Sequence, residues 1–116
     1  MARERIGEAT VHGAPRAIEI DPEAGRLELR AGDAVAFIQI RVRPPVLSFI
    51  HTEVPTELRG QHVADALARA GLEYARMRQM TVKPFCPFVA SYIRRHQEFQ
   101  DLVDPSFTGA DSAEPA

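Results

Sequence analysis

The stretch VLSFIHTEVPTELRGQHVADALARAG, residues 46–71, decides the fold because its pattern changes from that of a strand to that of a helix. Residues 46–54 are rich in β-branched and aromatic side chains, which favours a strand. From residue 61 to about residue 78, apolar residues recur at helical spacing and charged residues occupy the opposite side. The stretch therefore predicts a strand, a short loop and an amphipathic helix that packs on a sheet.

The residues that follow predict one more strand and one more helix. MTVKPF (80–85) reads as a short strand closed by proline. Pro87 suits the first position of a helix over 87–97, because the N–H that proline lacks has no partner there anyway. The strand–helix–strand order predicts that 46–54 and 80–85 run parallel and are joined by a right-handed crossover.

Upstream, three short segments have strand character: 16–20, 26–30 and 34–42. Their hairpin-length connections predict an antiparallel meander that continues into the strand at 46–54. The expected fold is α/β, more strictly α+β, with a mixed sheet: a β-meander followed by helix, strand and helix.

The ends of the chain differ in composition from its middle. Residues 1–15 mix charges with Gly, Ala and Pro and read as a flexible N-terminus, and 104–116, DPSFTGADSAEPA, reads as a disordered tail. The folded domain is therefore expected to span 16–103.

Composition excludes several classes of protein. The 116 residues are 45% hydrophobic and 26% charged, with a net charge of −2. No apolar run is long enough to span a bilayer, and the N-terminus lacks the apolar stretch of a secretory leader. A single cysteine cannot form an internal disulfide framework. The expected location is therefore the cytoplasm. The net charge argues against a nucleic acid partner, and the lack of a long apolar run argues against a membrane. No metal is expected, because the four histidines (His12, His51, His62 and His96) are widely spaced.

Two arginine pairs stand out locally, Arg41 with Arg43 and Arg94 with Arg95. Each pair has two interpretations: a solvated charged face, which is the more common case, or a site that binds an anion.

The strand-to-helix joint at Arg59-Gly60 is the first candidate site. Backbone N–H groups at the start of a helix, together with the helix dipole, form a site for an anion. Arg59 can add a charge-assisted contact, and Gly60 lets the backbone approach a ligand closely. A purely structural turn explains such a pair equally well when it stands alone.

Two longer motifs, one of which contains this joint, indicate a function for it. HTEVPTELRGQ (51–61) and KPFCPFVASYIRRH (83–96) resemble the hallmarks of small single-domain proteins in the GNAT superfamily of N-acetyltransferases. The resemblance covers about residues 25–103. It implies that the protein binds acetyl-CoA through the backbone of the helix start and of the preceding strand. The residues implied in that role are Val54, Arg59, Gly60, Gln61, His62, Val63, Ala64 and Asp65.

One position departs from the family pattern, since His62 stands where the family usually has glycine. That position lies against the pyrophosphate in family members. Its side chain either points away from the ligand or contacts the phosphates.

Four residues are candidates for the chemistry of acetyl transfer. His51 and Glu53 lie two apart on a strand and therefore share a face, where either can serve as a base; the structural alternative is that they hold the turn. Tyr92 corresponds to a tyrosine that in the family faces the sulfur and can protonate the leaving thiolate; the alternative is core packing.

Cys86 is the fourth candidate. It precedes Pro87 at the start of a helix, where the dipole favours a thiolate, so a transient acyl-cysteine is chemically possible. The alternative is an inert, buried cysteine that lines the site.

The resemblance implies an acetyl-CoA-dependent N-acetyltransferase that acts on a peptide, lysine or small amine, without a metal. The small domain predicts an open acceptor site and a monomer or weak dimer. The alternative is a module that binds CoA or acetyl-CoA without turnover.

Overall fold

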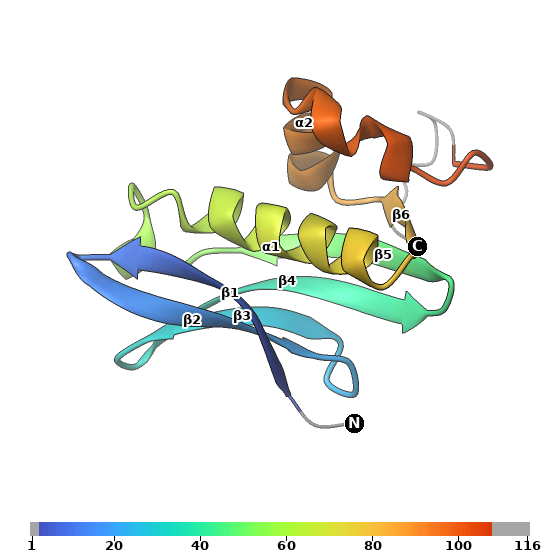
Figure 1. The fold of residues 1–116 in the computed structure, drawn as a ribbon. Helices are drawn as coiled ribbons and strands as arrows, with labels where there is room; N and C mark the ends of the chain where they lie inside the picture. The colour runs from blue at the N-terminus through green and yellow to red at the C-terminus, as the bar shows by residue number, and fades with distance from the viewer. Residues whose placement is uncertain (1–2, 108–116) are drawn as a thin grey trace.

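The structure is a computed structural model that describes residues 3–107. Its strands are β1 (Glu4–Val11), β2 (Ala14–Asp21), β3 (Arg26–Ala31), β4 (Ala34–Arg43), β5 (Val46–Glu53) and β6 (Thr81–Pro84). Its helices are α1 (Val63–Met77) and α2 (Pro87–Arg95), with short 3-10 helices η1 (Thr56–Leu58) and η2 (Gln97–Leu102). The six strands form one sheet in chain order, and α1 lies along it while α2 stands beside β6 (Figure 1).

The expected topology is confirmed between residues 14 and 95. Strands β2 to β5 pair as an antiparallel meander, and β5 pairs with β6 in parallel. The mixed sheet with helices after the meander is the α+β fold that the sequence predicted. The first helix is shorter than expected, because residues 61 and 62 belong to the turn before it.

The N-terminus corrects the sequence interpretation. Residues 1–15 were expected to be flexible, but β1 occupies 4–11 and pairs with β2. His12 and Gly13 form the two-residue turn between them, both with positive φ, as hairpin turns of this length require. Two of the inward positions of β1 before Val11 are the small residues Gly7 and Ala9, and a register shift next to Ile6 interrupts the alternation. Because of these features, the hydrophobic residues of β1 do not alternate clearly, and the sequence pattern does not indicate a strand.

At the other end, the expected tail at 104–116 lies only partly within the described residues. Asp104 N–H donates to the Val82 carbonyl at 2.9 Å, and the Phe107 ring meets Phe85 edge-on with centroids 5.4 Å apart. The first residues of the expected tail are therefore packed against β6 and its end, and residues 108–116 fall outside the described part.

The core lies between α1 and one face of the sheet. Alternate residues of the strands are fully buried there, among them Leu27, Ile38 and Phe49. Gly71 of α1 brings the helix axis close to the sheet, since a Cβ at this position would lie 2.7 Å from Leu27 Cδ1 and 2.8 Å from Phe49 Cε2. The helix is therefore seated at one depth and one rotation above β3 and β5.

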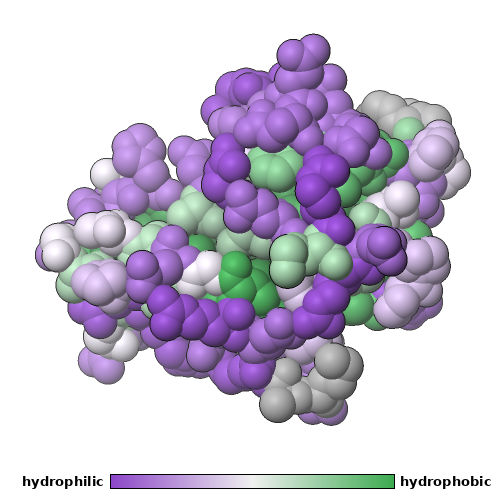
Figure 2. All heavy atoms as spheres, viewed as in Figure 1, coloured by the Kyte–Doolittle hydropathy of each residue, from purple (hydrophilic) through white to green (hydrophobic). Residues whose placement is uncertain are grey.

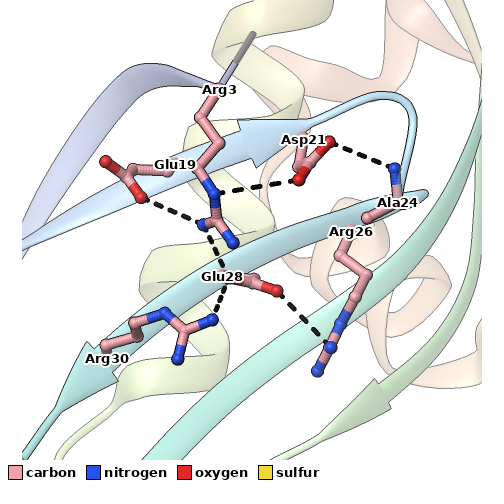
Figure 3. A network of polar contacts seen from close by, with 7 residues as sticks. All are labelled: Arg3, Glu19, Asp21, Ala24, Arg26, Glu28 and Arg30. Carbon is pink, nitrogen blue, oxygen red and sulfur yellow. Dashed lines mark hydrogen bonds and ion pairs between the residues drawn. The ribbon is translucent and has the colours of Figure 1, made fainter.

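The opposite face of the sheet carries no helix within residues 3–107 and is here called the open face (Figure 1). Its β2–β3 half is a network of ion pairs around Glu28, a carboxylate only 3% exposed (Figure 3). Arg3 lies 2.8 Å and Arg30 lies 3.2 Å from Oε1 of Glu28. Arg26 lies 3.4 Å from Oε2 of the same carboxylate. Several cations thus compensate one buried charge, as a buried carboxylate requires.

Candidate functional site

A pocket of about 310 Å³ lies where β5 ends and α1 begins. It is lined by Val54, Leu58, Arg59, Gly60, His62, Val63, Ala64, Asp65 and Phe88. The residues that the sequence assigned to ligand binding therefore gather at one place, with the exception of Gln61. Its side-chain oxygen accepts a hydrogen bond from His12 N–H at 3.0 Å, which ties the turn to the β1–β2 hairpin.

The turn before α1 has an unusual backbone. Gly60 has φ +82° and His62 has φ +59°, both in the left-handed region. A Cβ at Gly60 would meet no atom within 4 Å, so this glycine serves the backbone conformation rather than close packing. The same reasoning explains why glycine suits position 62, where histidine now stands.

Unpaired backbone donors border the pocket at the start of α1. The first hydrogen bond of the helix runs from Ala66 N–H to the His62 carbonyl at 3.1 Å, so the amides of residues 63–65 precede it. No side chain caps this end of the helix. Free N–H groups and the positive end of the helix dipole therefore face a pocket large enough for a phosphate group.

Charged side chains stand at the rim of this pocket. Arg59 Nε donates to the Val54 carbonyl at 3.2 Å, which holds the guanidinium over the end of β5. The His62 side chain is 87% exposed and lies 3.5 Å from Asp65 through Nδ1 and Oδ2. The imidazole therefore points toward solvent and leaves the backbone of the turn accessible.

Beside the pocket, β5 and β6 separate. Their parallel register ends at Phe49 opposite Pro84, and Cys86 N–H then donates to the Phe49 carbonyl at 2.8 Å. Beyond that bond, β5 runs on to Glu53 with β4 as its only strand neighbour in the described chain. An extended ligand with amide groups can pair with such a strand edge.

The structure places Cys86 against β5. Its side chain is 3% exposed, and its Sγ lies 3.2 Å from Thr52 Oγ1. Thr52 is opposite Ile38, a residue of the buried face, so the thiol lies on the helix side of the sheet. Sequence reasoning missed Thr52, which carries no signal beyond its alternation with His51 and Glu53.

His51 and Glu53 share a face, as predicted, with Nε2 and Oε1 3.3 Å apart. His51 is opposite Gln39 in the register with β4, whose exposed residues belong to the open face. Both side chains are more than half exposed. The two candidate bases therefore approach the end of β5 from the side opposite to Cys86.

Tyr92 lies apart from the other candidates, between α2 and α1. It is 3% exposed, and its ring stacks on His96 with centroids 3.8 Å apart. Burial raises the pKa of its hydroxyl above the ordinary value, and the charge and hydrogen bond of Arg69 oppose the rise. Phe88, one turn earlier on α2, is the residue of this helix that lines the pocket, and sequence reasoning missed it.

A second depression of about 290 Å³ lies between β1 and the end of α1. Hydrophobic side chains gather across the middle of this side of the molecule, within a hydrophilic surround (Figure 2). Met77, an apolar residue at the end of α1, is 81% exposed and lines the depression. Arg78 pairs with Glu4 there through two contacts of 2.6 and 2.7 Å. The charged side chains that line it are thus paired: Arg5 with Glu8, Glu73 with Arg69, and Glu4 with Arg78.

Metal and membrane features complete the survey. Within residues 3–107, no group of three or more His, Cys, Asp or Glu side chains is placed to hold a metal ion. No helix in that part of the chain is both long and apolar enough to cross a membrane.

A family model described as GCN5-related N-acetyl-transferase matches residues 26–102. The matched segment contains all residues that line the pocket at the start of α1, together with His51, Glu53, Cys86 and Tyr92. It leaves out β1 and β2.

Proposed function

Because this chain belongs to the GCN5-related N-acetyltransferase family, whose domain transfers acyl groups, we propose that it transfers the acetyl group of acetyl-CoA to an amine. One observation carries the proposal: the pocket at the start of α1 is built by the residues of the family-like motif. The pocket combines free backbone donors with Arg59, which is the arrangement that a pyrophosphate requires.

In this proposal the amides of residues 63–65 and the Arg59 guanidinium hold the pyrophosphate. The edge of β5 beyond Phe49 pairs with the amides of the pantetheine arm, and Phe88 covers the arm from α2. The thioester end then lies where β5 and β6 separate, close to Thr52 and Cys86.

The chemistry assigned to the chain is a direct transfer. The amine nitrogen attacks the thioester carbonyl carbon and the C–S bond breaks. The leaving thiolate takes up a proton. Before the attack, Glu53, or His51 beside it, removes a proton from the acceptor ammonium, directly or through a water molecule, and so frees the lone pair of the nitrogen. The exposure of both side chains on the open face fits an amine that arrives from that side.

Cys86 and Tyr92 take supporting roles in the proposal. Cys86 and Thr52 line the thioester end, and their hydroxyl and thiol are potential hydrogen-bond donors to it. Tyr92, whose pKa is raised by burial, keeps its proton at neutral pH, and its oxygen accepts a hydrogen bond from Arg69. Its contacts with Arg69 and His96 hold α2 against α1, which keeps Phe88 over the pocket.

Calorimetry with CoA and a transfer assay test the proposal together. Wild-type protein is expected to bind CoA and to acetylate at least one member of a panel of peptides, lysine derivatives and polyamines. Arg59→Gln is expected to bind CoA about ten- to a hundredfold more weakly, because a charge-assisted hydrogen bond contributes roughly 1.5–3 kcal/mol. Arg94→Gln removes the same charge from an exposed position of α2 outside the pocket and serves as the control.

A second candidate function is a module that binds CoA without turnover. His62 favours it, because a side chain stands in the phosphate turn where the family has glycine. Tight CoA binding without transfer to any amine would select this reading. Absence of CoA binding at millimolar concentration would contradict both.

A further inference from the structure

A third depression, of about 300 Å³, lies on the open face. It is lined by Arg41, Arg43, Val46, Ser48, Lys83 and Phe85. These residues come from β4, β5 and the segment of β6 and its end, away from the pocket at the start of α1. Nothing in the transfer chemistry above uses them.

The register of the sheet brings three of these residues into one row. Arg41 is opposite Ser48, and Ser48 is opposite Lys83, so the three side chains stand next to one another across three strands. We call them the cationic row. Neighbouring strands are about 4.8 Å apart, so two positive charges flank the Ser48 hydroxyl at a spacing that suits one small anion.

The charges of this depression are not compensated. On the β2–β3 half of the same face, Arg3, Arg26 and Arg30 all contact Glu28 (Figure 3). Arg41 and Arg43, by contrast, have no carboxylate partner among residues 3–107.

Lys83 forms no ion pair among residues 3–107, and its charge acts there on the carboxylate of Asp104. The pKa of Asp104 is lowered chiefly by the hydrogen bonds from Ser106, with Thr81 and the charge of Lys83 contributing less. Asp104 is thus satisfied by Ser106 and Thr81. The depression keeps a net positive charge although the chain as a whole is acidic.

Ser48 gives a second, independent indication of a ligand. The residue is 8% exposed, yet its hydroxyl has no hydrogen-bond partner in the described chain. It lines the depression between the cations. The hydroxyl is open to the depression, where an anion held by the two flanking cations would accept its hydrogen bond.

A bulge connects this depression to the candidate bases. In the register of β4 with β5, Gln39 is opposite His51 and Ile40 is opposite Phe49, so Ile50 is an extra residue. Because of it, Ser48 and His51 point to the same face although they are three positions apart. Measured along β4, His51 and Glu53 lie two and four residues from the cationic row, or about 7 and 14 Å.

We propose that the cationic row, together with Arg43, binds a carboxylate or phosphate group of the acceptor, and that the acceptor is a peptide with an acidic or phosphorylated residue two to four positions from the amine that is acetylated. The position of the amine rests on the proposed function, which places the base at His51 and Glu53. An extended peptide rises about 3.3 Å per residue, so this spacing matches the distance along β4. Phe85 offers an apolar wall to the side chain that carries the anion.

Three peptides with one lysine test the proposal. They are identical except at the third residue from the lysine, which is Asn, Asp or phosphoserine. Peptide affinity is measured by fluorescence anisotropy in the presence of CoA, and acetylation by mass spectrometry. At least one anionic peptide is expected to bind about tenfold more tightly than the Asn peptide, with a similar gain in kcat/KM. The gain should shrink as salt is raised, since the depression is open to solvent. The Asp and phosphoserine peptides distinguish the two sources of the anion.

The double variant Arg41→Gln/Arg43→Gln is expected to reduce this preference to within about twofold, since both charges are lost. The double variant Arg5→Gln/Arg94→Gln lowers the net charge equally at positions outside the depression and should keep the preference. Ser48→Ala is expected to lower the preference by a few-fold while it preserves the charges. CoA affinity, measured separately, reports whether each variant is folded.

The two readouts separate this inference from the proposed function. Equal affinity and equal kcat/KM for all three peptides, with acetylation observed, would overturn the anion site and leave the acetyltransferase proposal intact. A preference in binding that depends on Arg41 and Arg43, without acetylation of any peptide, would support the anion site and contradict the transfer activity. A preference that survives in Arg41→Gln/Arg43→Gln would overturn the assignment to these residues.

Discussion

His62 occupies a backbone conformation that residues other than glycine seldom adopt, and it does so in the turn that faces the proposed phosphate site. The conformation is imposed by the turn from Gly60 into α1 and not by contacts of the imidazole, which is 87% exposed. Backbone and side chain can therefore be examined separately at this position.

We expect His62→Gly to be as stable as the wild type or up to about 1 kcal/mol more stable, because relief of the positive φ outweighs the entropy that glycine adds to the unfolded chain. It should also bind CoA more tightly, since the turn loses a side chain. His62→Ala removes the imidazole but keeps a Cβ in the left-handed region and should be less stable than His62→Gly. Urea unfolding and calorimetry measure the two effects. Equal stability of the Gly and Ala variants would contradict the strain argument.

Cys86 poses a different question at the residue scale, namely whether it attacks the thioester or lines the pocket. Its burial and its contact with Thr52 fit a lining role. We expect Cys86→Ala to retain acetyl transfer and to lose about 1 kcal/mol of stability through the small cavity that it leaves. Intact-protein mass spectrometry after mixing with acetyl-CoA should show no acetyl adduct on Cys86. An adduct, together with loss of turnover in Cys86→Ala, would instead establish a covalent mechanism.

At the scale of elements, the seating of α1 decides the geometry of the proposed CoA site, because the helix start moves with the helix. Gly71 sets that seating through its approach to Leu27 and Phe49. We expect Gly71→Ala to destabilise the protein by about 1–3 kcal/mol, although alanine favours a helix, because the added methyl overlaps both side chains. Glu73→Ala, on the exposed side of the same helix, is the control and should change stability by less than about 0.5 kcal/mol. A Gly71→Ala variant more stable than the wild type would mean that Leu27 and Phe49 shift to make room for the added methyl group.

The packing of η2 on α1 depends on charge. Arg76 contacts both carboxylate oxygens of Asp101, at 2.9 and 3.1 Å, and Arg69 lies 3.3 Å from Glu98. The hydrogen bonds from Arg76 lower the pKa of Asp101 below its ordinary value. The resulting stabilisation is complete above the ordinary carboxylate pKa near 4 and is lost as pH falls through the lower pKa of the folded state.

Acidification should therefore weaken the protein, and Asp101→Asn should remove part of that dependence. We expect the free energy of unfolding of the wild type to fall more steeply below about pH 4 than that of the variant. Urea unfolding between neutral and acidic pH measures the difference. Asp33→Asn, in the exposed turn between β3 and β4, changes the same charge at a carboxylate with no ion pair among residues 3–107 and should follow the wild type. Identical pH profiles for all three proteins would show that the Arg76 contact contributes nothing.

At the scale of the whole molecule, β1 is part of the sheet although it lies outside the segment matched by the family. Val11 is fully buried at its end. We expect Val11→Ala to cost about 1–3 kcal/mol, as a buried position does, and Thr10→Ala on the exposed side of the same strand to cost little. Chemical denaturation measures both. A neutral Val11→Ala would indicate that the N-terminal strand contributes nothing to stability.

The elements that were predicted correctly are those in which the spacing of apolar residues and the size of their side chains indicate the same type of element. Leu27 and Leu29 alternate, and the helical face of α1 is marked by leucine and alanine, so these elements were identified correctly. The pocket lining was predicted because a turn that binds through its backbone leaves a recognisable Arg-Gly signature. Strand β1 was missed because its inward residues are small and a register shift interrupts them.

The positions of Tyr92 and of the cationic row were beyond sequence reasoning for another reason. Both positions depend on which elements pack beside one another. The surroundings of Tyr92 depend on the packing of α2 against α1, and those of Arg41 depend on the pairing of β4 with β5 and of β5 with β6. A residue's own neighbours in the chain do not encode that information. The two readings of Arg41 and Arg43, a solvated face or an anion site, could be weighed only once Ser48 and Lys83 were seen beside them.

The extra residue in β5 has a consequence for how this protein can change over time. Removing Ile50 would leave His51 opposite Gln39 and Thr52 opposite Ile38, so these side chains would keep their present faces and only the bulge would be lost. Removing Thr52 would instead move Glu53 into its place, opposite Ile38 on the helix side of the sheet. Lineages that keep the proposed reaction should therefore tolerate a single-codon deletion at Ile50 but not one at Thr52.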